Sequence, residues 1–231
     1  MRLVPPRERP HHDRMSPTLP SDPAAAAALL DDQSLHVWHL GYRRAQGRSP
    51  LRRLLAAYLD TEPDDVRLVE DAHGRPRLQD APARGLDFNW SHSGEHALVA
   101  IARGVVPGVD IERRRPRRQA LALARRFFDG AEVDALEALP EAARDDAFLE
   151  LWTAKEALLK AHGRGIAYGL QRVLVAASPA RLKLLRFDGE DVDAWQLQRL
   201  ALAPDLIAAV AWRGAARKIR SVSLPTLAEA G

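Results

Sequence analysis

The sequence predicts an α+β fold, built as two similar α+β halves that pack side by side about a pseudo-two-fold axis. Helical and strand-like periods mix along the 231 residues without a regular strand–helix alternation. The two stretches "HALVAIARG" (96–104) and "LIAAVAWRG" (206–214) each follow a helix and a turn, and they resemble each other. We place the halves at residues 34–105 and 106–231, with residues 1–33 as a mostly disordered extension.

The N-terminal elements follow from local patterns. Residues 1–33 are rich in Pro, Arg, His, Asp and Ala and have little apolar period, which is typical of a loosely attached segment. Alternating apolar residues predict a strand over 35–40, and leucines at helical spacing predict a helix over 49–60. "DAHGRPRL" (71–78) reads as a turn followed by extended chain, and a strand is expected around 96–102.

The C-terminal half is expected to open with a strand over 107–112. Three helical segments are expected next. The first begins after Pro116, the second covers about 131–143, and the third, the longest, covers about 144–162. The later segments have a strand period. These strands are expected at 172–177, 182–187, 194–201 and 205–213.

Composition excludes several classes of protein. The chain has no cysteine, so it contains neither disulfides nor thiolate metal sites, and no stretch has the apolar length of a membrane span. We see no secretory signal and expect a cytoplasmic protein. The net charge is +3, and arginines cluster at 43–53, 113–118 and 213–220. Arginine clusters favour anionic partners, although a general compositional bias of the surface explains them equally well.

Asp110 and Glu112 are the first candidate functional pair. On a strand, residues i and i+2 project from the same face, so the two carboxylates repel each other. Mg²⁺ prefers oxygen ligands and would relieve this repulsion. The alternative is two exposed acids that face the basic stretch "RRRPRR" (113–118).

Three charged residues of the long helix need separate explanations. Glu156 and Lys160 lie one turn apart and could form an ordinary surface ion pair, or Glu156 could be a third metal-binding carboxylate. Lys155 falls inside the apolar arc of the helix, where an ammonium group needs a partner or loses its proton. Either its stem extends along the apolar surface to water, or it meets a polyanion or the acids that hold the metal.

Weaker candidates lie in the N-terminal half. In "SHS" (91–93), Ser91 and His92 stand just before the strand around 96–102, where they could form an anion-binding turn, although such a histidine is more often a structural hydrogen-bonding residue. Arg48 would suit a terminal phosphate, because guanidinium groups match phosphate oxygens.

The order of these motifs resembles the 4′-phosphopantetheinyl transferases of the Sfp-like, two-half type. The resemblance covers about residues 43–213 and depends most on "GVDIE" and on the spacing WxxKExxxK. The matching stretches are "GRP" (74–76), "FNWSHSG" (88–94), "GVDIE" (108–112), "FF" (127–128) and "LWTAKEALLKAHGRG" (151–165).

The resemblance implies an enzyme that transfers the phosphopantetheine arm of coenzyme A to a serine hydroxyl of an apo carrier protein and releases adenosine 3′,5′-bisphosphate. The active site would lie where the halves meet. By this resemblance Asp110, Glu112 and Glu156 bind Mg²⁺, Lys160 contacts the pyrophosphate, and Lys155 helps to fix the acids and phosphates. Cofactor contacts are implied for Arg48, Gly74, Arg75, Pro76, Ser91, His92, Ile111 (through its backbone) and Lys160, and Glu132 matches a further family acid.

The expected partners are coenzyme A and an acyl, polyketide or peptidyl carrier protein, with neither nucleic acid nor membrane, and the chain is expected to be a monomer. The segment between the first strand and Arg43 is shorter than in the family, which affects the 3′-phosphate end of the pocket. A degenerate member that only binds coenzyme A or carrier protein is therefore an alternative. A basic nucleic-acid-binding module is another, although aromatic residues make up only 6% of the chain.

Overall fold

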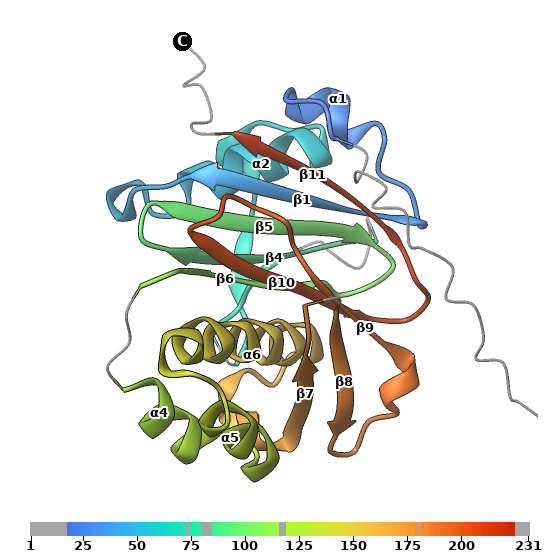
Figure 1. Cartoon of the computed structure of the whole chain (residues 1–231). Coiled ribbons are helices and arrows are strands. Elements are labelled where there is room, and N and C mark those ends of the chain that lie inside the picture. The colour runs from blue at the N-terminus through green and yellow to red at the C-terminus, as the bar shows by residue number, and fades with distance from the viewer. Residues whose placement is uncertain (1–17, 73, 80–84, 116–118, 180, 225–231) are drawn as a thin grey trace, which may run out of the picture.

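The computed structural model describes residues 18–224 except 73, 80–84, 116–118 and 180. Two mostly antiparallel sheets stack face to face in the middle of the molecule, and helices cover the outer face of each sheet (Figure 1). Three groups of buried apolar residues fill the spaces between these four layers. The molecule is therefore a mixed α+β structure, as the sequence predicts.

The first sheet has four strands in the order β11-β1-β5-β4. Its central pair, β1 and β5, is antiparallel, whereas β11 runs parallel to β1, with Ser34 opposite Lys218. β11 therefore brings the C-terminal end of the described chain back into the sheet of the N-terminal half. The strands are β1 (Ser34–Gly41), β4 (Leu86–Ser93), β5 (His96–Arg103) and β11 (Lys218–Leu224).

The second sheet has the order β6-β10-β9 and is antiparallel throughout. Val109 and Ile111 of β6 pack with Val37 and Leu98 of the first sheet in the apolar layer between the sheets. Two small hairpins complete the strands. The bounds are β6 (Gly108–Arg113), β9 (Trp195–Arg199), β10 (Leu206–Arg213), β2 (Leu68–Glu70), β3 (Pro76–Leu78), β7 (Val173–Ala177) and β8 (Leu182–Phe187).

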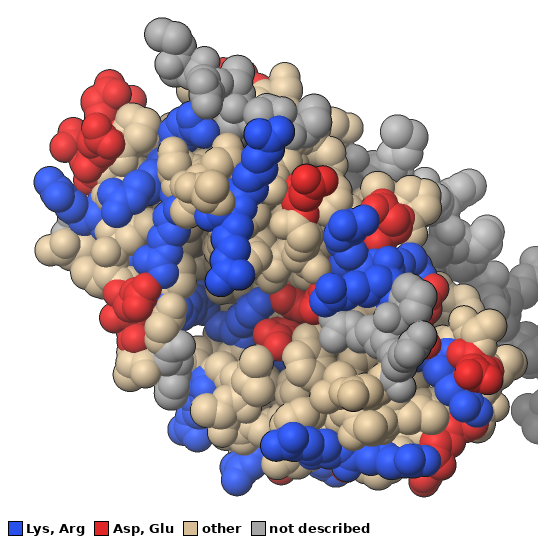
Figure 2. Space-filling model, turned by 90° about the vertical axis from the view of Figure 1, so that its left-hand side faces the viewer, with Lys and Arg blue, Asp and Glu red and all other residues tan. Residues whose placement is uncertain are grey.

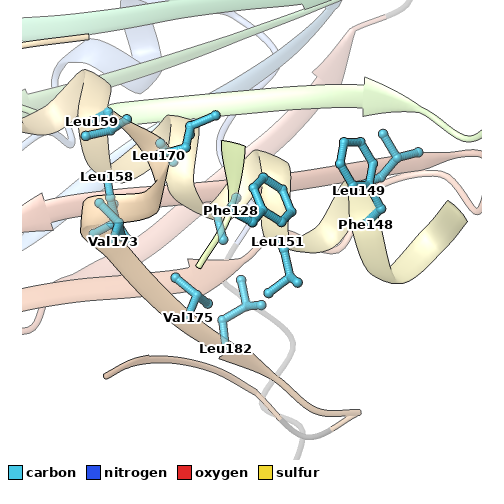
Figure 3. Packing of buried hydrophobic residues seen from close by; sticks show 14 of the residues in the cluster. Phe128, Phe148, Leu149, Leu151, Leu158, Leu159, Leu170, Val173, Val175 and Leu182 are labelled. Atoms are coloured by element: carbon cyan, nitrogen blue, oxygen red, sulfur yellow. The ribbon is translucent and has the colours of Figure 1, made fainter. Parts of the chain in front are cut away.

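Helices α1 and α2 cover the first sheet, and α6 covers the second (Figure 1). Beneath α6, the buried side chains of α4, α5, β7 and β8 form one apolar cluster, in which Phe128 stacks on Phe148 at 5.2 Å between ring centroids (Figure 3). The helices are α1 (Pro23–Ala27), α2 (Ser49–Leu59), α4 (Ala120–Phe127), α5 (Gly130–Glu137) and α6 (Glu141–His162). The 3-10 turns are η1 (Arg44–Gln46), η2 (Pro63–Asp65), η3 (Ile166–Tyr168), η4 (Leu170–Arg172) and η5 (Val192–Ala194).

Close contact between α6 and β6 depends on one glycine. A Cβ added at Gly108 would lie 2.0 Å from the Ala157 carbonyl oxygen and 2.5 Å from the Ala161 nitrogen. No side chain fits at this crossing, so β6 approaches the backbone of α6 directly. This contact sets the distance between the carboxylates of β6 and the charged residues of α6.

Several elements differ from the sequence expectation. Residues 18–33 are not loosely attached, because α1 begins under an Asp22 cap and Leu19, Ala26 and Leu30 are buried; residues 1–17 lie outside the described residues. The expected helix over 131–143 is two helices, separated before Pro140, the residue that precedes α6. β4, β11 and α1 were not expected at all. The pseudo-two-fold relation and the boundary at residue 105 remain predictions.

Candidate functional site

Strand β4 provides three polar side chains that face β6. Asn89, Ser91 and Ser93 alternate along β4, so they share one face of the strand. "SHS" thus lies within a strand and does not form the turn expected from the sequence. The three bonds run from the Val109 nitrogen to Asn89 Oδ1 (2.8 Å), from Ser91 Oγ to Asp110 Oδ1 (2.7 Å) and from Ser93 Oγ to Glu112 Oε2 (2.8 Å). These bonds hold the carboxylates of β6 in fixed positions.

Lys160 of α6 joins this arrangement from the opposite side. Its ammonium donates to Asp110 Oδ1 at 2.7 Å and to Ser91 Oγ at 3.1 Å, and it lies 3.6 Å from Glu156 Oε2. A further bond reaches the Val109 carbonyl at 3.2 Å. Strand β4, strand β6 and helix α6 therefore meet at one ammonium group, whose side chain stays 24% exposed.

The charges in this cluster perturb one another. Burial, the Asp110 carboxylate and the Glu112 carboxylate raise the pKa of Glu156 to about 7, although Lys160 opposes the shift. Burial alone would lower the pKa of Lys160, but Asp110 and Glu156 more than offset it, so the pKa of Lys160 is raised. Glu156 can therefore bind and release a proton near neutral pH, while Lys160 stays charged.

A cavity of about 430 Å³ opens beside this cluster. Glu156 and Lys160 line it together with the turn Gly74–Pro76, where Gly74 has a φ of +76°. Figure 2 shows a hollow on one face of the molecule in which acidic and basic side chains meet. The lining residues are Gly74, Arg75, Pro76, Asn89, Trp90, Glu156, Leu159, Lys160, Gly163, Arg164, Gly165, Ile166 and Ala167.

Other predicted residues lie outside this lining. Arg48 precedes α2 and pairs with Glu70 at 2.5 Å on the exposed surface. His92 is exposed on β4, with its ring 5.0 Å from that of Tyr42. Ile111 is buried between the two sheets, so its side chain is part of the core.

Lys155 differs most from the sequence expectation. Its side chain is fully buried and pairs with Glu132, and it also donates to the carbonyls of Leu170, at 3.0 Å, and Val173. Its ammonium lies 4.7 Å from the centre of the Phe128 ring. Lys155 therefore contacts neither the acidic cluster nor the cavity lining, so the expectation that it fixes the acids of β6 is wrong, and its contact with phosphates stays a prediction.

Glu132 is a structural partner in the same place. Its carboxylate accepts from the Val175 nitrogen at 2.9 Å and from the Asp129 nitrogen at 3.1 Å, which caps α5. Burial lowers the pKa of Lys155 and raises that of Glu132, and the attraction between the two opposes both shifts. The pair ties α5 and β7 to α6 in the core.

One observation indicates that the acidic cluster could hold a divalent cation. Asp110 Oδ2 is buried and has no hydrogen-bond partner within the described part of the chain, so one carboxylate oxygen has unused acceptor capacity. No group of three or more His, Asp or Glu side chains among the described residues is already arranged as a metal site. Asp110 and Glu156 are the carboxylates joined through Lys160, and Glu112 acts on Glu156 through its charge.

The sequence patterns did not indicate part of the cavity lining. Asn89, Trp90 and the segment 163–167 after α6 belong to it. Gly163 and Gly165 have φ values of +88° and +59° and turn the chain sharply after the helix. In the sequence, the signal for this segment is the pair of glycines in "HGRG" (162–165), which by itself predicts only the end of a helix.

Several known proteins are similar to this chain. A sequence profile described as the 4′-phosphopantetheinyl transferase superfamily matches residues 107–211. The 4′-phosphopantetheinyl transferase HetI of Nostoc sp. is 38% identical over 173 residues, which cover 74% of this chain and 71% of that protein. A Synechocystis sp. protein with a provisional 4′-phosphopantetheinyl transferase name is 39% identical over 68% of this chain, and the match spans 64% of its own length.

Two further proteins are more distantly similar to this chain. The 4′-phosphopantetheinyl transferase Sfp of Bacillus subtilis is 30% identical over 56% of this chain and 55% of that protein. Among solved structures, a holo-(acyl-carrier-protein) synthase from Bacillus anthracis in complex with CoA (3′,5′-ADP) is 16% identical, with a TM-score of 0.35 over 47% of this chain and 96% of that chain. A similarity of that size does not bear on the fold.

Proposed function

Because this chain belongs to the 4′-phosphopantetheinyl transferase superfamily, we propose that it transfers the 4′-phosphopantetheine arm of coenzyme A to a serine hydroxyl of an apo carrier protein. The other product is adenosine 3′,5′-bisphosphate. The carrier is an acyl, polyketide or peptidyl carrier protein, and the enzyme works as a cytoplasmic monomer.

The main support is the junction of Ser91, Asp110, Glu156 and Lys160 beside a cavity that Glu156 and Lys160 line. A diphosphate needs positive charge close to carboxylates that can hold a cation, and this junction offers both within hydrogen-bond distance of one another. The cavity of about 430 Å³ has an apolar wall that includes Trp90, Leu159 and Ile166, which suits a nucleotide base.

Each residue of the cluster has a role in this proposal. Lys160 holds its charge beside the departing phosphate and stabilises the negative charge that develops there. Glu156 takes the proton of the attacking serine, directly or through a water. Its pKa is about 7 in the site without a metal ion. Ser91 keeps Asp110 and Lys160 in register through its two hydrogen bonds.

Asp110 and Glu156, with Glu112 beside them, would hold Mg²⁺. When bound, Mg²⁺ neutralises part of the diphosphate charge and so makes the phosphorus more open to attack. Asp110 Oδ2, which has no partner in the described part of the chain, supports this assignment.

Intact-mass spectrometry of an apo carrier protein tests the activity. Incubation with the enzyme, coenzyme A and Mg²⁺ should add the mass of one phosphopantetheine arm, and a carrier whose acceptor serine is replaced by alanine should stay unmodified. Binding of coenzyme A without added mass on any of the three carrier classes would indicate a degenerate binding protein. Salt-sensitive DNA binding without transfer would indicate the nucleic-acid-binding alternative.

A further inference from the structure

The guanidinium group of Arg75 is almost completely enclosed by protein. Its side chain is 9% exposed, and its two terminal nitrogens donate to four acceptors. The acceptors are the carbonyls of Lys160 (2.5 Å), Phe88 (2.7 Å) and Pro107 (3.2 Å) and Asp87 Oδ1 (3.1 Å).

These acceptors belong to separate parts of the fold. Asp87 and Phe88 are on β4, Pro107 directly precedes β6, and Lys160 is in the last turn of α6. Carbonyls in the last turn of a helix have no partner within the helix. Arg75 provides that partner for Lys160 from the β2–β3 hairpin of the N-terminal half, so one side chain joins three elements of the site.

The turn that carries Arg75 is itself well fixed. The Arg75 nitrogen donates to Asp71 Oδ1 at 3.0 Å, and the Asp71 nitrogen donates to the Arg75 carbonyl at 3.0 Å. Gly74, with its positive φ, allows this tight turn. The position of the guanidinium group therefore follows from a rigid hairpin tip.

We propose that Arg75 is a positioning residue, which fixes the end of α6 so that the Lys160 ammonium stays against Asp110 and Ser91. This role rests on the proposed transferase activity, and it differs from the contact with coenzyme A that the resemblance implies. Both terminal nitrogens of Arg75 already bind protein oxygens, so only Nε has no partner among the described residues. A lysine could not replace Arg75, because one ammonium cannot span four acceptors that a planar fork reaches.

Arg77 provides a matched control. It lies on the same hairpin and pairs with Asp71 at 3.1 Å and with Asp87 at 3.5 Å. Within the described part of the chain, its hydrogen bonds and ion pairs reach neither α6 nor the residues before β6. Arg77→Gln therefore removes the same charge from the same hairpin and leaves the clamp on α6 intact.

Steady-state kinetics with coenzyme A and an apo carrier protein separate positioning from binding. In Arg75→Gln and in Arg75→Lys we expect kcat to fall roughly 10- to 100-fold, because small displacements of reacting groups have effects of that order. The KM for coenzyme A should change less than about threefold, and Arg77→Gln should behave like the wild type. A raised KM with unchanged kcat, or full activity of Arg75→Lys, would overturn the proposal.

Hydrogen–deuterium exchange tests the clamp without any activity. Amides of residues 157–163 should lose at least about tenfold protection in Arg75→Gln and keep it in Arg77→Gln, because the helix end then opens locally. If Arg75→Gln does not fold, Arg75→Lys serves for both measurements. If the wild type transfers nothing, the proposed activity fails while the exchange experiment still decides on the clamp; equal exchange in all variants refutes it.

Discussion

Helix α6 carries two lysines five residues apart that sit in opposite kinds of environment. Lys155 is fully buried, and its ammonium has Glu132 and two carbonyls as partners. Lys160 is 24% exposed at the edge of a cavity, and the Asp110 carboxylate beside it keeps one oxygen without a partner in the described part of the chain. The first cluster is closed, and the second is open.

The difference shows that a lysine–carboxylate ion pair can have a structural role in one place and a chemical role in another. In the closed cluster every charge is matched inside the protein, so it binds nothing further and fixes how α5, β7 and α6 pack. In the open cluster the carboxylates of Asp110 and Glu156 face one lysine. Burial and the negative charges of Asp110 and Glu112 raise the pKa of Glu156 to about 7. Negative charges gathered in this way favour the binding of a cation or a proton.

The largest effect is expected when the closed cluster is broken. Lys155→Met leaves Glu132 buried without its cation, and we expect the free energy of unfolding in urea to fall by about 3–5 kcal/mol. The exposed Lys183→Met on β8 should change it by less than about 0.5 kcal/mol. The double variant Lys155→Met/Glu132→Leu should recover part of the loss. A single variant as stable as the wild type would show that the closed cluster does not hold the core.

Substitutions in the open cluster should have the reverse effect, with a large loss of activity and a small loss of stability. Glu156→Gln and Asp110→Asn are expected to lower kcat roughly 10²–10³-fold, as when a charge-stabilising group is lost. Their stability should fall by less than about 1 kcal/mol, because each removes a charge from a group of repelling carboxylates. Glu150→Gln, on the same helix and paired with Arg199 at 3.0 Å, should keep its activity. Wild-type activity in either cluster variant would argue against the catalytic role.

The open cluster should also make stability depend on pH in a definite direction. The pKa of Glu156 is raised in the folded state from 4.5 to about 7, so the folded state binds an extra proton between those values. That contribution is present below about pH 4.5 and is lost as the pH rises through about 7. Relative to Glu156→Gln, the wild type should therefore gain on the order of 2 kcal/mol between pH 8 and pH 5. Urea unfolding at both pH values measures this, and a gain in the opposite direction would contradict the raised pKa.

The smallest effect is expected at Arg48, which belongs to neither cluster. Its pair with Glu70 is exposed, so Arg48→Gln should change the free energy of unfolding by less than about 1 kcal/mol. If Arg48 binds the 3′-phosphate, the KM for coenzyme A should rise about fivefold at unchanged kcat, whereas Glu70→Gln should not raise it. An unchanged KM in Arg48→Gln would leave Arg48 as a surface partner of Glu70.

Most regular elements could be predicted from local pattern, and β4 shows why an exception could not. The long helix was expected over 144–162 and is found at Glu141–His162, because its apolar arc is strong. β4 was missed, since "LDFNWSHS" carries Asn, Ser and His where a strand usually has apolar side chains. Asn89, Ser91 and Ser93 are hydrogen-bonded to β6, a partner that only the tertiary structure reveals.

The candidate site was predictable to a similar degree. The helical wheel correctly places Lys155 among apolar residues, but its partner Glu132 comes from another helix and cannot be inferred from spacing. The resemblance alone implies a contact of Arg75 with coenzyme A, whereas its four acceptors in the protein lie 12 to 85 residues away along the chain. Long-range hydrogen bonds of this kind leave no periodic signal.

The parallel pairing of β1 with β11 has a consequence for synthesis on the ribosome. Lys218 is the register partner of Ser34. At typical elongation rates it is synthesised roughly 10–40 s after Ser34. Throughout that interval one edge of β1 has unsatisfied backbone groups that any other extended segment could pair with. A nascent chain of this fold is therefore most exposed to mispairing at its earliest strand, and shielding of that edge by a chaperone is most useful before the final strand arrives.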